Sequence, residues 1–240
     1  MPRKTGLLSL AASLVLVFTF PEYLDGAESQ WIRLRTANFE MYSSASPRTA
    51  RDVVQDFEQV RAFFLPVIGK VADKSTPVRL VAFRSEKEFA PYRPNEFAVA
   101  YYQPTADLDY IVMSRSGSDI FPIAVHEYVH LLARHSGLKL PPWLNEGIAE
   151  LYSTLRPMGD KILVGSLIPG RHQALLEEKW VPLATILAAD QDSPYYNERS
   201  KAGSLYNEGW ALTHMLYFRA EYRPKLGELL RRVSAGEESV

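Results

Sequence analysis

The segment 126–130 has the sequence HEYVH, in which two histidines lie four positions apart and the first is followed by a glutamate. In a helix, His126 and His130 would share one face about 6 Å apart along the axis, so that both imidazoles can bind one small cation. Glu127 would point about 100° away from His126, where it can overhang the metal without binding it. The pattern therefore predicts two ligands and the carboxylate base of a zinc hydrolase.

A catalytic zinc ion usually has about three protein ligands and a water molecule, so this site needs a third ligand. Segment 143–150, WLNEGIAE, follows two prolines and is predicted to lie in a second helix. Glu146, one turn into that helix, is the predicted third ligand, and Glu150 shares its face. We expect Glu150 to accept the second ring N–H of a ligand histidine. The alternative is an ordinary helix pair whose charged residues face solvent.

Zinc held in this way would lower the pKa of its water to about 7, and Glu127 would take up the proton of this water and deliver it to the leaving amine. The oxyanion of the tetrahedral intermediate needs a donor, for which Tyr206 is the candidate. The alternative is that the Tyr206 side chain only packs in the core. His214, on the same helix face as Tyr206, is a candidate second donor to the oxyanion. His135 lies about 180° from His126 around the helix and is expected to face solvent rather than the metal.

The composition of the 240-residue chain is that of a globular protein, with 47% hydrophobic residues and a net charge of −1. This balance excludes the basic surface typical of nucleic-acid binding, and the expected partner of the site is a peptide or protein substrate. Cysteine is absent, so a zinc ion must be held by histidine and carboxylate. No phosphate-binding loop or dinucleotide fingerprint is present, and one zinc ion is the only cofactor expected.

Residues 1–27 are predicted to be a targeting segment. Arg3 and Lys4 precede an uncharged, mostly apolar stretch at 6–20, which is shorter than the ~20 residues of a membrane span and typical of a signal peptide. Ala27 is a candidate last residue of the signal, although Asp25 is unusual two positions before a cleavage site. The protein is therefore predicted to be exported. The alternative is an uncleaved membrane anchor formed by 6–20, the only expected contact with a membrane.

The remaining chain, 28–240, is predicted to form one α+β domain. Residues 28–118 should form an α/β lobe with a mixed or antiparallel sheet, and 119–240 a mostly helical lobe that carries the metal site. Strands are expected at 31–42, 77–83, 97–102, 110–114 and 161–164. Helices are expected after Ser46, after Ser85, at the two metal segments and at 171–179, 182–189, 203–221 and 224–235, with a loop at 190–199.

The first metal helix has predicted ends: Ser118 or Asp119 as its N-cap, Pro122 in its first turn and Gly137 after its last turn. Segments 97–102 and 110–114 are expected to form an antiparallel hairpin just before this helix. Either strand can end beside the metal. An exposed sheet edge at that place can pair with an extended peptide.

The motifs resemble those of the gluzincin metallopeptidases, and most of all their peptidase MA-like branch of bacterial exported proteins. The resemblance covers HEYVH at 126–130 and WLNEGIAE at 143–150 and, more loosely, an opening strand at 31–39 and the helix at 206–210. It implies a zincin-like domain over 28–240, in which zinc is bound by His126, His130 and Glu146 and Glu127 is the base.

The WLNEGIA run is also similar to that of membrane alanyl aminopeptidases, which have a longer gap between the second histidine and the glutamate. Their GxMEN motif, which binds the substrate amine, is missing from this chain. The leading hypothesis is therefore an exported zinc metalloendopeptidase. The alternatives are a catalytically inactive zinc-binding envelope domain that acts as a binding module, and a scaffold without metal. Glu127 favours catalysis, because a purely structural site has no use for a base.

Overall fold

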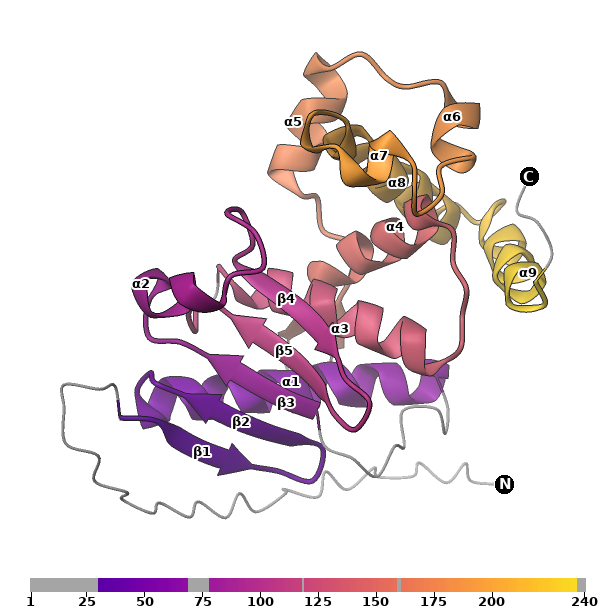
Figure 1. The fold of residues 1–240 in the computed structure, drawn as a ribbon. Coiled ribbons are helices and arrows are strands. Elements are labelled where there is room, and N and C mark those ends of the chain that lie inside the picture. Colours follow the sequence, from indigo (N-terminus) through magenta and orange to yellow (C-terminus); the bar gives the residue numbers. More distant parts are fainter. Residues whose placement is uncertain (1–29, 69–77, 118, 159–160, 237–240) are drawn as a thin grey trace, which may run out of the picture.

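A five-stranded mixed sheet forms the first part of the fold (Figure 1). The computed structural model describes residues 30–68, 78–117, 119–158 and 161–236. Within these ranges the strand order is β1-β2-β3-β5-β4, with bounds Ile32–Arg35 (β1), Phe39–Ser43 (β2), Val78–Ala82 (β3), Ala100–Pro104 (β4) and Asp109–Met113 (β5). β3 runs parallel to β2 and β5, whereas β1 and β4 are antiparallel to their neighbours. The predicted α+β class with a mixed sheet is confirmed, and β4 is an edge strand of this sheet.

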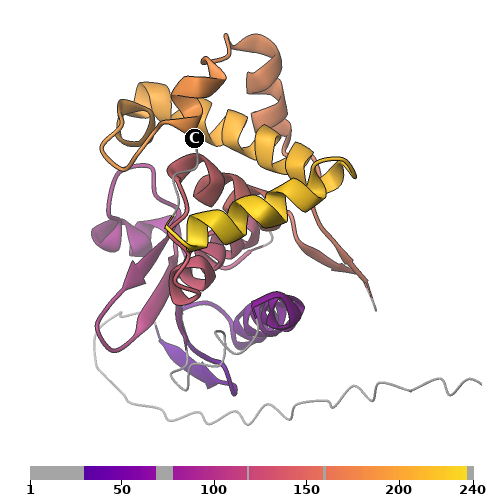
Figure 2. The same ribbon diagram turned by 90° about the vertical axis from the view of Figure 1, so that its right-hand side faces the viewer.

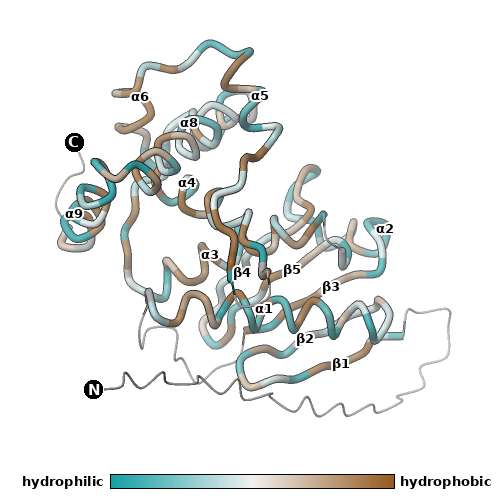
Figure 3. The backbone as a smooth tube through the Cα atoms, turned by 180° about the vertical axis from the view of Figure 1, so that it is seen from behind, coloured by the Kyte–Doolittle hydropathy of each residue, from teal (hydrophilic) through white to brown (hydrophobic). Residues whose placement is uncertain are grey.

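Helix α1 (Pro47–Ile68) packs on one face of the sheet. Hydrophobic and hydrophilic stretches alternate along it (Figure 3), and its buried side chains recur at helical spacing: Val53, Phe57, Val60 and Phe64. The ring of Phe57 meets Phe39 of β2 and Tyr128 of the first metal helix edge-on. One hydrophobic core is thus shared by the sheet, α1 and the helix that carries HEYVH.

The predicted hairpin before the metal helix is confirmed as β4 and β5, with strand bounds shifted by one to three residues. Its turn is closed by Thr105, whose backbone N–H donates to the carbonyl of Leu108 at 2.9 Å. Upstream of the hairpin, the short helix α2 (Glu86–Phe89) begins at Ser85 as predicted, because the Ser85 side chain accepts the N–H of Glu88. A 3-10 turn, Ala90–Tyr92, follows it.

The two metal motifs lie on consecutive helices, α3 (Phe121–His135) and α4 (Pro142–Ser153). The predicted end of α3 is confirmed: Gly137 has a φ of 71°, a conformation that favours glycine. The predicted cap of α3 is wrong for Asp119. Ile120 occupies the N-cap position with no capping side chain among the described residues, and Asp119 pairs with Arg115 instead. Ser118 lies outside the described residues.

Helix α8 (Arg199–Phe218) crosses α4 with the two backbones in close approach. A Cβ atom on Gly147 would lie 2.4 Å from the carbonyl oxygen of Gly209, and one on Gly209 would lie 2.7 Å from that of Trp143. Any larger residue at either position would therefore push the helices apart. The close crossing holds α4 between α3 and α8 (Figure 2) and buries Glu146, which is 2% exposed.

The rest of the described chain is mostly helical, as predicted. It comprises a small hairpin of β6 (Arg156–Met158) and β7 (Lys161–Leu163) and the helices α5 (Pro169–Glu177), α6 (Leu183–Leu187), α7 (Pro194–Asn197) and α9 (Arg223–Ser234). Helix α7 corrects the predicted loop at 190–199; its signals are Ser193, which caps it, and Pro194 in its first turn. Within the described ranges no helix combines the length and hydropathy of a membrane span, and the predicted signal at 1–27 lies outside those ranges.

Candidate metal centre

Three side chains from α3 and α4 bring one ligand atom each to a common point. The Nε2 atoms of His126 and His130 are 3.0 Å apart. Oε2 of Glu146 lies 3.2 Å from Nε2 of His126 and 3.4 Å from Nε2 of His130. These are the three residues predicted as metal ligands, and the structure shows that together they can hold a metal ion.

The donor set of this triad fits a cation. Oε2 of Glu146 is buried and has no hydrogen-bond partner among the described residues, although it lies between two imidazoles. A buried carboxylate oxygen without a partner is costly, and a cation at this point would remove that cost. With Glu146 2% and Glu150 8% exposed, the alternative of solvent-facing charges on a helix pair is wrong for both residues.

The pKa values of the triad favour positive charge at the same point. Burial by itself would raise the pKa of Glu146, but its contacts with His126 and His130 outweigh burial and lower the pKa to about 2. For His130, burial works to lower the pKa, and the neighbouring carboxylate of Glu146 raises it overall. The ionised carboxylate of Glu146 thus favours positive charge at the point between the two imidazoles, whether that charge is a proton or a metal ion.

Glu127 lies beside the triad and contributes no atom to it, as predicted. Its Oε2 accepts the backbone N–H of Tyr102 in β4 at 2.9 Å. Burial raises the pKa of Glu127, against the opposing effect of His126 and His130. The edge strand of the sheet thus fixes the carboxylate beside the two imidazoles.

Glu150 lies on the side of the other ring nitrogen of His126, with its Oε1 3.6 Å from Nδ1, which is longer than the predicted hydrogen bond. The same oxygen accepts a hydrogen bond from Nη2 of Arg171 in α5 at 2.5 Å. A second guanidinium nitrogen of Arg171 donates to the side-chain oxygen of Asn207 in α8 at 3.2 Å. Sequence reasoning missed Arg171, which carries no local motif and reaches Glu150 only through the docking of α5 on α8.

Tyr206 and His214 lie on α8, as predicted, but in different surroundings. The ring of Tyr206 is stacked with that of His126, with centroids 6.4 Å apart. The guanidinium of Arg171 lies 5.0 Å from the centroid of the Tyr206 ring, because α5 is docked on α8. Burial raises the pKa of Tyr206, so its hydroxyl stays protonated. Nε2 of His214 lies 3.0 Å from the carbonyl oxygen of Gly165, outside the metal triad.

Tyr196 of α7 is a further residue that sequence reasoning missed. Its hydroxyl donates to Oε1 of Glu146 at 3.3 Å. Burial, together with the nearby Glu146 carboxylate, raises the pKa of Tyr196 to about 12, so the phenol remains a donor at neutral pH. The segment 190–199 was predicted to be a Tyr-rich loop, and nothing local in it indicates which tyrosine faces the metal helices.

His135 does not face solvent, which corrects the prediction made from its helical angle. Its Nε2 lies 2.5 Å from Oδ2 of Asp109, and its side chain is only 10% exposed. The hydroxyl of Tyr102 donates to the other Asp109 oxygen at 2.7 Å. The β4–β5 hairpin folds over the end of α3 and buries this ring, an arrangement that helical periodicity alone cannot indicate. His135 is outside the metal triad, as predicted.

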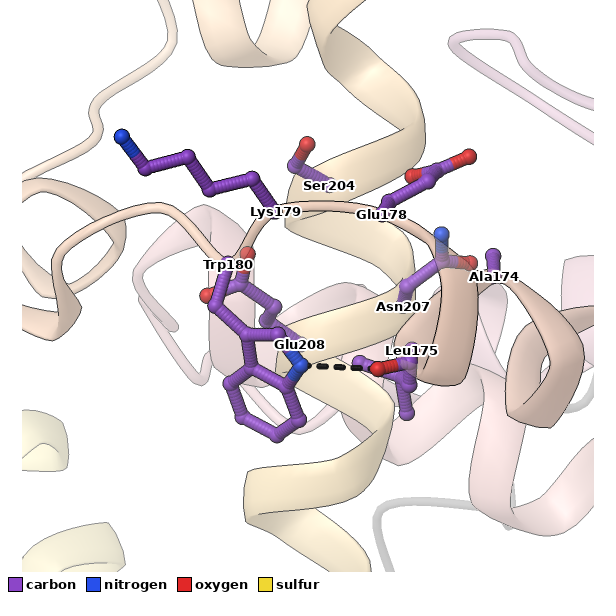
Figure 4. Close-up of a pocket in the computed structure, with 8 residues that line it drawn as sticks. All are labelled: Ala174, Leu175, Glu178, Lys179, Trp180, Ser204, Asn207 and Glu208. Carbon is purple, nitrogen blue, oxygen red and sulfur yellow. Dashed lines mark hydrogen bonds between the residues drawn. The ribbon is translucent and has the colours of Figure 1, made fainter.

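A shallow pocket between α5 and α8 shows how the helical layer is held (Figure 4). The indole N–H of Trp180 donates to the carbonyl of Leu175 at 2.9 Å. Oε1 of Glu208 accepts the backbone N–H of Val181 at 2.8 Å. The first bond fixes the chain after α5 to α5 itself, and the second ties it to α8. Together they help to keep Arg171 in reach of Glu150.

A comparison with protein-family models and a search of the curated proteins find no match to this chain. The geometry therefore carries the functional argument. It establishes a group of two largely buried histidines and a buried glutamate that can hold a metal ion, with the carboxyl group of Glu127 beside it.

Proposed function

We propose that the protein is a zinc-dependent metallopeptidase that hydrolyses peptide bonds. The observation that carries the proposal is the convergence of His126, His130 and Glu146 next to a carboxylate that is not a ligand, Glu127. Two imidazoles and a carboxylate are a donor set that zinc takes in catalytic sites. Ligands at roughly 2.0–2.1 Å from a tetrahedral zinc ion are about 3.3 Å apart, close to the 3.0, 3.2 and 3.4 Å found here.

The residues of the chain divide the remaining work. When bound, zinc would act as a Lewis acid that activates water and polarises a carbonyl group. Glu127, held by the amide of Tyr102, would accept the proton of the attacking water and pass it to the leaving amine. The Tyr206 hydroxyl is the proposed donor to the oxyanion. The resemblance of both motifs to the gluzincins supports the same activity, and the predicted signal at 1–27, or an anchor at 6–20, supports a site of action outside the cytoplasm.

The edge strand β4 supports an extended peptide as the substrate. Backbone N–H groups of an antiparallel strand point alternately to its partner and to the free side. The N–H of Tyr102 points to Glu127, so Ala100, two residues earlier, presents its backbone groups on the same side. A peptide paired there would lie along β4 beside the metal triad.

The proposal is tested by metal analysis of the purified protein, followed by digestion of a peptide library with and without a chelator. We expect about one zinc per chain and cleavage that stops on chelation and returns with zinc. Backbone N-methylation of a good substrate, one position at a time, should lower kcat/KM up to about tenfold at alternate positions, because one hydrogen bond contributes about 0.5–1.5 kcal/mol. Zinc without any cleavage would favour the binding-module alternative, and a protein without metal would contradict the proposal.

Changing Glu150 to Gln is expected to lower zinc affinity or activity 10–100-fold. The glutamine side chain can still accept from Arg171, but the negative charge that faces Nδ1 of His126 is lost. Zinc competition titrations should rank Glu146→Gln as more damaging and the exposed control Glu221→Gln as silent, within about 0.5 kcal/mol. Wild-type zinc affinity and activity in the Glu150→Gln protein would leave Glu150 with no role in the site.

A further inference from the structure

Tyr196 reaches the metal triad from a segment fifty positions further along the chain. It lies in α7, whose position is set locally: Oγ of Ser193 accepts the N–H of Tyr195, and the Asn197 side chain donates to the carbonyl of Gln191 at 2.6 Å. The ring of Tyr196 packs in the apolar cluster formed around Trp143 and Leu205, between α4 and α8. These contacts fix the position of α7, and α7 in turn holds the Tyr196 hydroxyl against Glu146.

The two oxygens of the Glu146 carboxylate have different surroundings. Oε1 takes the hydroxyl of Tyr196 at 3.3 Å, whereas Oε2 lies between the Nε2 atoms of His126 and His130 without a hydrogen-bond partner among the described residues. The terminal torsion of a glutamate is broad, so nothing in the side chain itself decides which oxygen faces the histidines. A donor on one oxygen removes that freedom and leaves the other for a cation.

We infer that Tyr196 is a positioning residue for Glu146: its hydroxyl holds Oε1 and thereby directs Oε2 to the metal point shared with His126 and His130. The inference rests on the proposed function, because it concerns the affinity of the same site for zinc. It assigns Tyr196 no contact with the substrate. Carboxylates that bind metals are commonly hydrogen-bonded by an outer partner, which orients the ligand and tunes the site.

The test is Tyr196→Phe, which keeps the ring in the apolar cluster and removes only the hydroxyl. We expect zinc affinity, measured by competition with a chromophoric chelator, to fall 10–100-fold. The matched control is Tyr195→Phe, the neighbouring tyrosine of the same short helix, which should keep wild-type affinity. At saturating zinc the Tyr196→Phe protein should recover most of its peptidase activity, since a positioning residue acts through Glu146 alone.

The outcomes separate this inference from the proposed function. If the wild-type protein binds no zinc, the proposed function fails and the inference fails with it. If wild type binds zinc and Tyr196→Phe binds it equally well, the proposed function stands and the inference is overturned. An equal loss of affinity in both tyrosine variants, or a common drop in thermal unfolding temperature, would assign Tyr196 to packing. Activity still low at saturating zinc would assign it to the reaction and overturn the positioning role.

Discussion

Replacing Glu127 with Gln is expected to slow peptide hydrolysis at least ~100-fold, the lower end of the contribution of a general base. The amide oxygen of Gln can still accept the N–H of Tyr102, so the side chain keeps its place while losing its ability to take a proton. Because Glu127 contributes no atom to the triad, zinc content should stay at the wild-type level. Steady-state kinetics on one peptide, with metal analysis of the same samples, measures both quantities.

The control for this substitution is Glu221→Gln, an exposed position where the same change in charge should leave kcat/KM unaltered. Equal activity in the wild-type and Glu127→Gln proteins would disprove the assignment of the base. Loss of zinc together with loss of activity would instead make Glu127 part of the metal-binding set, against its position in the structure. No activity in either protein would favour the inactive binding module.

Local spacing was enough to predict the triad. His126 and His130 are brought to one face by the helix itself, and the prolines at 141–142 start α4 where the pattern indicates. Glu146 comes from α4, not from the helix of the two histidines. Gly147 and Gly209 allow α4 and α8 to cross closely, and Glu146 is buried next to this crossing rather than facing solvent. The positions of the three ligands therefore depend mainly on spacing within a helix and on where a helix starts, and both can be predicted from the sequence.

The outer partners of the triad depend on docking and could not be predicted. Arg171 and Tyr196 come from α5 and α7, and each meets a carboxylate of α4 only because these short helices pack on α8. His135 illustrates the same limit, because its helical angle is correct but the hairpin at Asp109 folds over it. In each case the decisive neighbour is more than twenty residues away, beyond the reach of periodicity or capping signals.

Replacing His126 with Ala is expected to remove bound zinc almost entirely. The change leaves two ligands where a catalytic zinc ion usually has three, so its effect should exceed the 10–100-fold expected for an outer partner such as Glu150. His126 also stacks with Tyr206 and is largely buried, so the variant is checked for folding by circular dichroism and thermal unfolding before elemental analysis. A folded variant without zinc would confirm the ligand.

The matched control is His172→Ala, which removes an exposed histidine of α5 and should retain a full complement of zinc. The comparison matters because histidine can also bind zinc adventitiously at a surface, and zinc bound in that way would remain in the His126→Ala protein. Undiminished zinc in folded His126→Ala would refute the triad itself. In that case the 3.0 Å approach of the two imidazoles would need another explanation, such as a proton shared between them.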